Sequence, residues 1–134
     1  MKLDPTSFGN AVTRLREGLH RHEHEPKDDQ IRDGLIQRFE FTYELSHRTL
    51  KRYLKKTAGS PDEIERMPFA DLIRAGKAQG LLLGDWPAWR RFREMRTRTS
   101  HTYDAKAASQ IVTAIPAFLR KTERLFAELQ RRLA

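Results

Sequence analysis

Apolar residues return every three or four positions along most of this chain, and this spacing restricts the fold more than any other feature of the sequence. It gathers apolar side chains on one face of an α-helix, whereas a β-strand requires strict alternation of apolar and polar residues. The pattern is clearest near the carboxyl end, where Ile111, Ile115, Phe118, Leu125 and Leu129 share one face. The sequence therefore predicts an all-α protein.

Four main helices and a short connecting helix account for the spacing. The predicted helices lie at about residues 8–19, 31–54, 69–78, 86–96 and 104–133. Ser60, Pro61 and Glu63 form a capping-box pattern that favours a further helix start after the second helix. Asp85 is placed to cap the fourth helix, and Pro116 should bend or split the last one. We expect a single domain over residues 1–134, folded as an antiparallel, up-down bundle.

The chain is strongly basic and contains no cysteine. Its 134 residues carry a formal charge of +8, which favours a polyanionic partner, although a helical surface can be basic without binding one. The absence of cysteine excludes disulfides and thiolate metal sites. No apolar run reaches the roughly 18 residues of a membrane span, and the first residues lack a signal core, so we expect a cytoplasmic protein.

The segment MRTRTSHTYD, residues 95–104, interrupts the helical pattern. Arg96 continues the apolar stripe formed by Trp89 and Phe92, so its charge points toward the interior or an interface. In an unbroken helix His101 would be turned roughly 140° away from Arg96. The hydroxyl residues between them favour caps and turns, so the sequence predicts that the helix stops here.

Arginine and histidine together provide the chemistry that metal-free phosphodiester cleavage requires. A guanidinium group suits a phosphate, and an imidazole titrates near neutrality, so Arg96 can stabilise charge while His101 transfers a proton. An arginine and a histidine at a helix end also form ordinary capping and ion-pair contacts. The residue types alone leave both interpretations open.

The same segment resembles a known motif. Arg96, His101 and Tyr103 fit the R-x4-H-x-Y motif of HEPN-domain proteins. Residues 32–45 (RDGLIQRFEFTYEL) and 89–103 are similar to the HEPN branch of nucleotidyltransferase substrate-binding proteins, or HepT-type toxins. One position departs from the pattern, because Thr97 follows the motif arginine where the family often has asparagine.

This resemblance implies a HEPN-like homodimer that cleaves RNA without a metal or cofactor, as the toxin of a toxin–antitoxin module. It implies Arg96 and His101 as the catalytic residues. The implied partner is a minimal nucleotidyltransferase antitoxin, which blocks the cleft by adding adenylate to Tyr103.

Other polar residues are candidates for supporting roles. Glu40 and Glu44 lie on a polar stripe of the second helix and are candidates, with Thr97, for orienting Arg96; the stripe can equally be an ordinary water-facing side. Arg90, Arg93 and Arg98 are candidates for binding RNA phosphates. His20 and His24 have a spacing that permits metal chelation, but a solvated helix end explains them better, and we expect no metal site.

Three functions remain open from the sequence. The first is a ribonuclease toxin neutralised by a nucleotidyltransferase. The second is a non-catalytic subunit that presents a substrate, or Tyr103 itself, to that transferase, and Thr97 keeps this alternative open. The third is a basic helical adaptor, which leaves the arginine, histidine and tyrosine at the helix break unexplained.

Overall fold

The structure is a computed structural model that describes residues 3–82 and 86–134, and these residues form helices and connecting turns without any β-strand. The helices are α1 (Thr6–His24), α2 (Asp29–Thr57), α3 (Pro61–Glu65), α4 (Phe69–Ala78), α5 (Trp86–Thr97), the 3₁₀ turn η1 (Arg98–His101) and α6 (Ala105–Leu133). The predicted all-α bundle is confirmed. The described helices offer no segment long and apolar enough to cross a membrane.

Side-chain caps set the starts of the two longest helices. The Asp28 carboxylate accepts a hydrogen bond from the Ile31 amide at the start of α2, and Asp104 accepts one from the Lys106 amide at the start of α6. The predicted start of the last helix near Asp104 is therefore confirmed. Of the two effects expected of Pro116, a bend or a split, the split is wrong, because α6 continues through it to Leu133.

The short helices lie where the turn signals predicted them. Helix α3 begins at Pro61 with Ser60 at the capping position, although the Ser60 side chain makes no capping hydrogen bond. Helix α4 occupies the predicted range of the connecting helix. The predicted cap at Asp85 lies outside the described residues.

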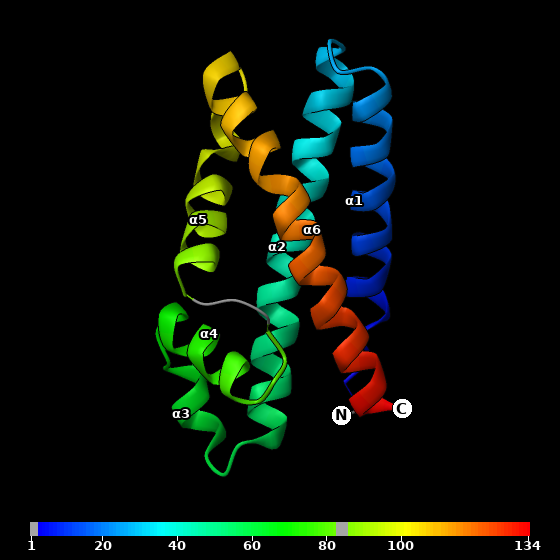
Figure 1. Ribbon diagram of the computed structural model, residues 1–134. Coiled ribbons are helices and arrows are strands. Elements are labelled where there is room, and N and C mark those ends of the chain that lie inside the picture. Colours follow the sequence, from blue (N-terminus) through cyan, green and yellow to red (C-terminus); the bar gives the residue numbers. More distant parts are fainter. Residues whose placement is uncertain (1–2, 83–85) are drawn as a thin grey trace.

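An aromatic cluster holds α5 against the two long helices. The ring of Phe118 on α6 lies 4.8 Å from Phe39 of α2 and 5.2 Å from Phe92 of α5, measured between ring centroids. All three side chains are buried. In Figure 1, α6 crosses α2, α1 lies along one side of this pair, and α5 lies on the other side. This packing fixes the carboxyl end of α5, where the interrupted segment begins.

Candidate functional site

Helix α5 ends within the segment that the sequence marked as an interruption. The hydroxyl of Thr97 donates to the carbonyl of Arg93, and the buried hydroxyl of Thr99 donates to the carbonyl of Arg96 at 2.7 Å. These hydroxyls donate hydrogen bonds to carbonyl groups at the end of the helix, and the chain continues as the 3₁₀ turn η1. The predicted stop between Arg96 and His101 is confirmed.

Arg96 is held against α2 by a carboxylate. Its Nε and Nη2 atoms lie 2.8 Å and 2.7 Å from Oε1 of Glu44, and Nη2 lies 3.9 Å from Oε1 of Glu40. Its Nη1 donates to the hydroxyl of Thr99 at 3.3 Å. Two residues of the polar stripe of α2 thus contact Arg96, and their role in orienting it for a reaction stays a prediction. Thr97 does not share in this contact, because its hydroxyl is bonded to Arg93.

Thr99 is a member of this arrangement that the sequence did not single out. Its side chain is 8% exposed and links the backbone and the guanidinium of Arg96. A run of hydroxyl residues indicates a turn, but it does not show which hydroxyl is buried. The guanidinium of Arg96 thus donates hydrogen bonds to Glu44 and Thr99, and its Nη2 atom is in ion-pair contact with Glu44.

His101 and Tyr103 form an exposed pair beyond the helix end. The Tyr103 hydroxyl lies 3.5 Å from Nδ1 of His101, and the Tyr103 side chain is 85% exposed. Within residues 3–82 and 86–134, no hydrogen bond connects Arg96 to His101. One chain thus places the arginine against α2 and the histidine toward solvent.

The three arginines proposed as candidates for binding RNA phosphates contact different parts of the protein. Arg90 pairs with Glu94 on α5, and the Arg93 guanidinium lies 5.4 Å from the centre of the Phe69 ring. Arg98 turns the other way and bonds to the side-chain oxygen of Gln110 on α6. Arg98 therefore lies apart from Arg93, whereas Arg90 and Arg93, three residues apart on α5, remain neighbours on the helix surface.

Two titratable groups of α2 lie beside this site. Burial raises the pKa of Tyr43 to about 12, so its phenol stays protonated at physiological pH. Burial lowers the pKa of His47 below its ordinary value, and the charge of Lys51 lowers it further. The His47 ring packs edge-on against Phe69, with 4.8 Å between ring centroids. Sequence reasoning missed both residues, although His47 continues the stripe of Glu40 and Glu44.

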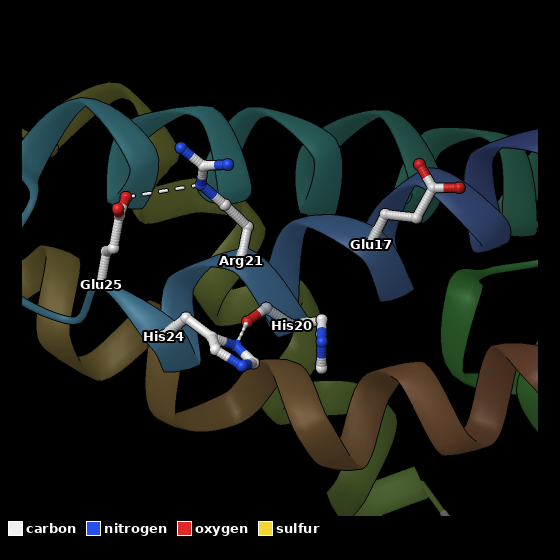
Figure 2. A pocket seen from close by; sticks show the side chains of 5 residues that line it. All are labelled: Glu17, His20, Arg21, His24 and Glu25. Carbon is white, nitrogen blue, oxygen red and sulfur yellow. Dashed lines mark hydrogen bonds and ion pairs between the residues drawn. The ribbon is translucent and has the colours of Figure 1, made fainter.

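The histidine-rich end of α1 forms an open depression of about 420 Å³. Figure 2 shows that the Nδ1 atom of His24 faces the carbonyl oxygen of His20, at 2.9 Å, and that Arg21 pairs with Glu25. The depression is lined by Glu17, His20, Arg21, His24 and Glu25. In the described part of the chain, no group of three or more histidine or acidic side chains is arranged to hold a metal ion.

Residues 3–131 match the profile of the family described as nucleotidyltransferase substrate binding protein like. The chain belongs to the nucleotidyltransferase substrate-binding family. The resemblance inferred from Arg96, His101 and Tyr103 is thereby confirmed at the level of the family.

Two relatives of this substrate-binding family come from Haemophilus influenzae. One, named probable ribonuclease HepT, is 39% identical over 104 residues, which cover 78% of this chain and 70% of the relative. The other is a solved structure described as the fold of a substrate binding domain of a nucleotidyltransferase. It is 31% identical, with a TM-score of 0.88 over 95% of this chain and 99% of that one.

Proposed function

We propose that this protein is a HepT-type endoribonuclease toxin that cleaves RNA without a metal, and that a nucleotidyltransferase antitoxin neutralises it. The observation that carries the proposal is the helix break, which leaves Arg96 fixed by Glu44 and presents His101 with Tyr103 on the adjoining turn. The relative named probable ribonuclease HepT supports the reaction class.

The proposed reaction uses the ribose 2′-hydroxyl as the nucleophile. The 2′-oxygen attacks the adjacent phosphorus while the bond from phosphorus to the 5′-oxygen breaks, giving a 2′,3′-cyclic phosphate and a 5′-hydroxyl end. Arg96 stabilises the charge that develops on the phosphate oxygens. His101 takes the proton from the 2′-hydroxyl or gives one to the leaving 5′-oxygen. DNA lacks this nucleophile and should not be cut.

The proposed active site is completed by a second copy of the chain. His101 is exposed and makes no hydrogen bond to Arg96 within the described residues of one chain. A twofold axis would bring two histidines and two arginines to one cleft, so that one histidine acts as base and the other as acid. We therefore propose a homodimer as the active form.

Tyr103 is the proposed site of neutralisation. Its phenolic oxygen would bond to the α-phosphorus of ATP as the bond from that phosphorus to pyrophosphate breaks, and the phenolic proton would leave. The exposed side chain admits this modification. Because the hydroxyl lies 3.5 Å from Nδ1 of His101, the added phosphate would occupy the surroundings of the proposed proton carrier.

A second candidate function is a non-catalytic subunit that presents a substrate to the transferase. Two observations favour it. Glu44 and Glu40 neutralise Arg96 from the side of α2, and the solved relative is described as a substrate binding domain. The two candidates differ in whether the unmodified protein cuts RNA.

The deciding experiment is cleavage of RNA by the purified, unmodified protein in excess chelator. We expect cutting that survives EDTA, leaves cyclic phosphate ends, and is lost in both Arg96→Ala and His101→Ala. Arg74→Ala and His24→Ala are the matched controls, because they remove an exposed arginine of α4 and an exposed histidine of α1, neither of which belongs to the proposed site. An active His101→Ala variant overturns the mechanism, and an inactive parent dimer favours the presenting subunit.

The neutralisation step has its own test. After incubation with the nucleotidyltransferase and ATP, mass spectrometry should find adenylate on Tyr103 and none on the buried Tyr43 and Tyr53. A Tyr103→Phe variant should remain unmodified and escape inhibition. Inhibition of this variant as strong as that of the parent would instead indicate that the partner acts by binding alone.

A further inference from the structure

Helix α6 presents three basic residues and a threonine in a line on its outer face. Lys106, Thr113, Arg120 and Arg124 follow a spacing of seven, seven and four residues, which keeps them on one side of a helix. All four side chains are exposed. The interval from residue 106 to residue 124 spans about 27 Å at about 1.5 Å per residue. This face is called the α6 track below.

The cations of the α6 track are not neutralised by the acidic residues of the same helix. Glu123 pairs with Arg16 of α1, and Glu128 pairs with Arg131 and Arg132 near the end of α6. No carboxylate within the described residues forms an ion pair with Lys106, Arg120 or Arg124. The positive charge of this face is therefore available to a ligand.

A depression continues the α6 track toward α5 and η1. It has a volume of about 260 Å³ and is lined by Arg91, Met95, Arg98, Ser109, Gln110 and Thr113. Arg98 is bonded to the neutral Gln110 side chain, and Arg91 has no ion-pair partner among the described residues. Two further cations thus face hydroxyl and amide groups, which suit the oxygens of a phosphodiester.

We infer that the α6 track and this depression bind the sugar–phosphate backbone of single-stranded RNA and lead it to the turn that carries His101. The RNA identity of the ligand rests on the proposed function. Arg98 and His101 are the first and last residues of η1, so a strand seated in the depression reaches the proposed site directly. The α6 track would contact phosphates and not bases, so it would contribute to the affinity for RNA and not to sequence specificity.

The chemistry of the face favours a nucleic acid over an anionic membrane. A helix that lies on a membrane pairs its basic residues with large apolar side chains that enter the lipid. The α6 track instead places Thr113 and Ala117 between its cations, and the apolar side of α6 is buried in the core. The α6 track therefore offers no large apolar side chain that could enter the lipid.

The test is binding of a labelled single-stranded RNA with 2′-O-methyl riboses, which cannot be cleaved, measured by fluorescence anisotropy over a salt series. We expect Arg120→Gln/Arg124→Gln to bind several-fold more weakly and to lower the slope of log affinity against log salt by about 1.4, or about 0.7 per lost phosphate contact. The control, Arg14→Gln/Lys56→Gln, removes two exposed cations from other helices and should leave the slope unchanged.

The outcomes separate this inference from the proposed nuclease function. His101→Ala should bind the same RNA as the parent does, even though it should not cut cleavable RNA. An unchanged slope in the Arg120→Gln/Arg124→Gln protein, or an equal loss in the control, overturns the α6 track. Loss of binding to phosphatidylserine vesicles with RNA binding unchanged would assign the face to membranes and also overturn it. If the parent protein does not cut RNA but its binding shows the expected salt dependence, the proposed nuclease function fails and the α6 track is still supported.

Discussion

Arg96 is the residue on which the proposed chemistry depends. Its surroundings are unusual for an arginine that binds a phosphate. Two carboxylates approach one guanidinium, with Glu44 at 2.7 Å and Glu40 at 3.9 Å from Nη2. They orient the arginine, and they also oppose the approach of an anion. The arrangement therefore favours a fixed orientation of Arg96 over tight binding of the RNA phosphate.

This balance gives a prediction for Glu44. In Glu44→Ala the arginine loses its anchor, so we expect kcat for RNA cleavage to fall by about 100-fold, because small displacements of catalytic groups have effects of this size. KM should fall as well, since one opposing charge is gone. Glu44→Gln, which keeps one acceptor, should lie between the parent and Glu44→Ala.

Gln37→Ala, an exposed change two turns earlier on α2, is the control for Glu44. Steady-state kinetics on one RNA substrate provide the comparison. A Glu44→Ala protein with the kcat of the parent would show that Glu44 does not position Arg96 for catalysis.

The residues of the site were predictable to different degrees. Helical spacing placed Glu40 and Glu44 on one stripe of a long helix, but only the packing of α5 against α2 shows that this stripe meets Arg96. The separation of Arg93 from Arg98 follows from the same geometry, because five residues along a helix turn a side chain by about 140°. The buried position of Thr99 depends on the packing of η1 against other helices, and no local pattern encodes it.

Among the elements, α2 joins the site to the rest of the bundle and carries a half-buried histidine. The lowered pKa of His47 means that the folded protein favours the neutral imidazole. Protons then bind more strongly to the unfolded chain, so this contribution to stability is complete above about pH 6.5 and is lost as the pH falls toward the folded-state pKa.

We therefore expect the parent to lose more stability than His47→Gln between about pH 7.5 and about pH 5. Urea denaturation at each pH measures the difference. His101→Gln, which changes an exposed histidine, is the control and should follow the parent. Equal losses of stability in the parent and in His47→Gln would show that His47 is not the source of the pH dependence.

The contact of α1 with α6 depends on a glycine. A Cβ atom added at Gly9 would lie 2.5 Å from Cζ of Phe126, whereas a Cβ at Gly34 of α2 would meet nothing within 4 Å. We expect Gly9→Ala to lower the free energy of unfolding by about 1–3 kcal/mol. Gly34→Ala should raise it by up to about 1 kcal/mol, because alanine favours helix. Equilibrium urea unfolding tests both, and a stabilised Gly9→Ala would contradict the close contact.

The elements were more predictable than the site, because their signals are local. Asp104 and the Ser60–Pro61 pair mark helix starts through the bonding and φ preferences of single residues. Pro116 was harder to judge from sequence. The neighbouring Ile115 and Phe118 are fully buried, and such packing can hold a helix together across a residue that lacks an amide hydrogen.

At the scale of the whole molecule, the proposed homodimer requires a surface, and the outer face of α2 offers one. Phe41 is 57% exposed at the middle of this helix, and Arg48 and Arg52 follow it on the same side, whereas Asp29 and Asp33 pair with Arg32 of the same helix. An antiparallel copy would bury this phenylalanine against its counterpart across the twofold axis. We expect Phe41→Asp to convert the dimer to a monomer.

Analytical ultracentrifugation measures this change in mass, and the matched change Gln130→Asp on α6 should leave the dimer intact. The Phe41→Asp monomer should also lose RNA cleavage, because the second histidine is missing. A Phe41→Asp protein that remains dimeric would place the contact on another face.

The first described residues and the carboxyl terminus both lie at the end of the bundle opposite η1 (Figure 1). Helix α6 alone, with 29 residues, separates the carboxyl end from the turn by about 43 Å. A reporter or affinity tag attached at either end therefore leaves Tyr103 uncovered. By the same geometry, the active site of the proposed transferase would have to span this distance to reach Tyr103 if it were joined to the carboxyl end of the same chain.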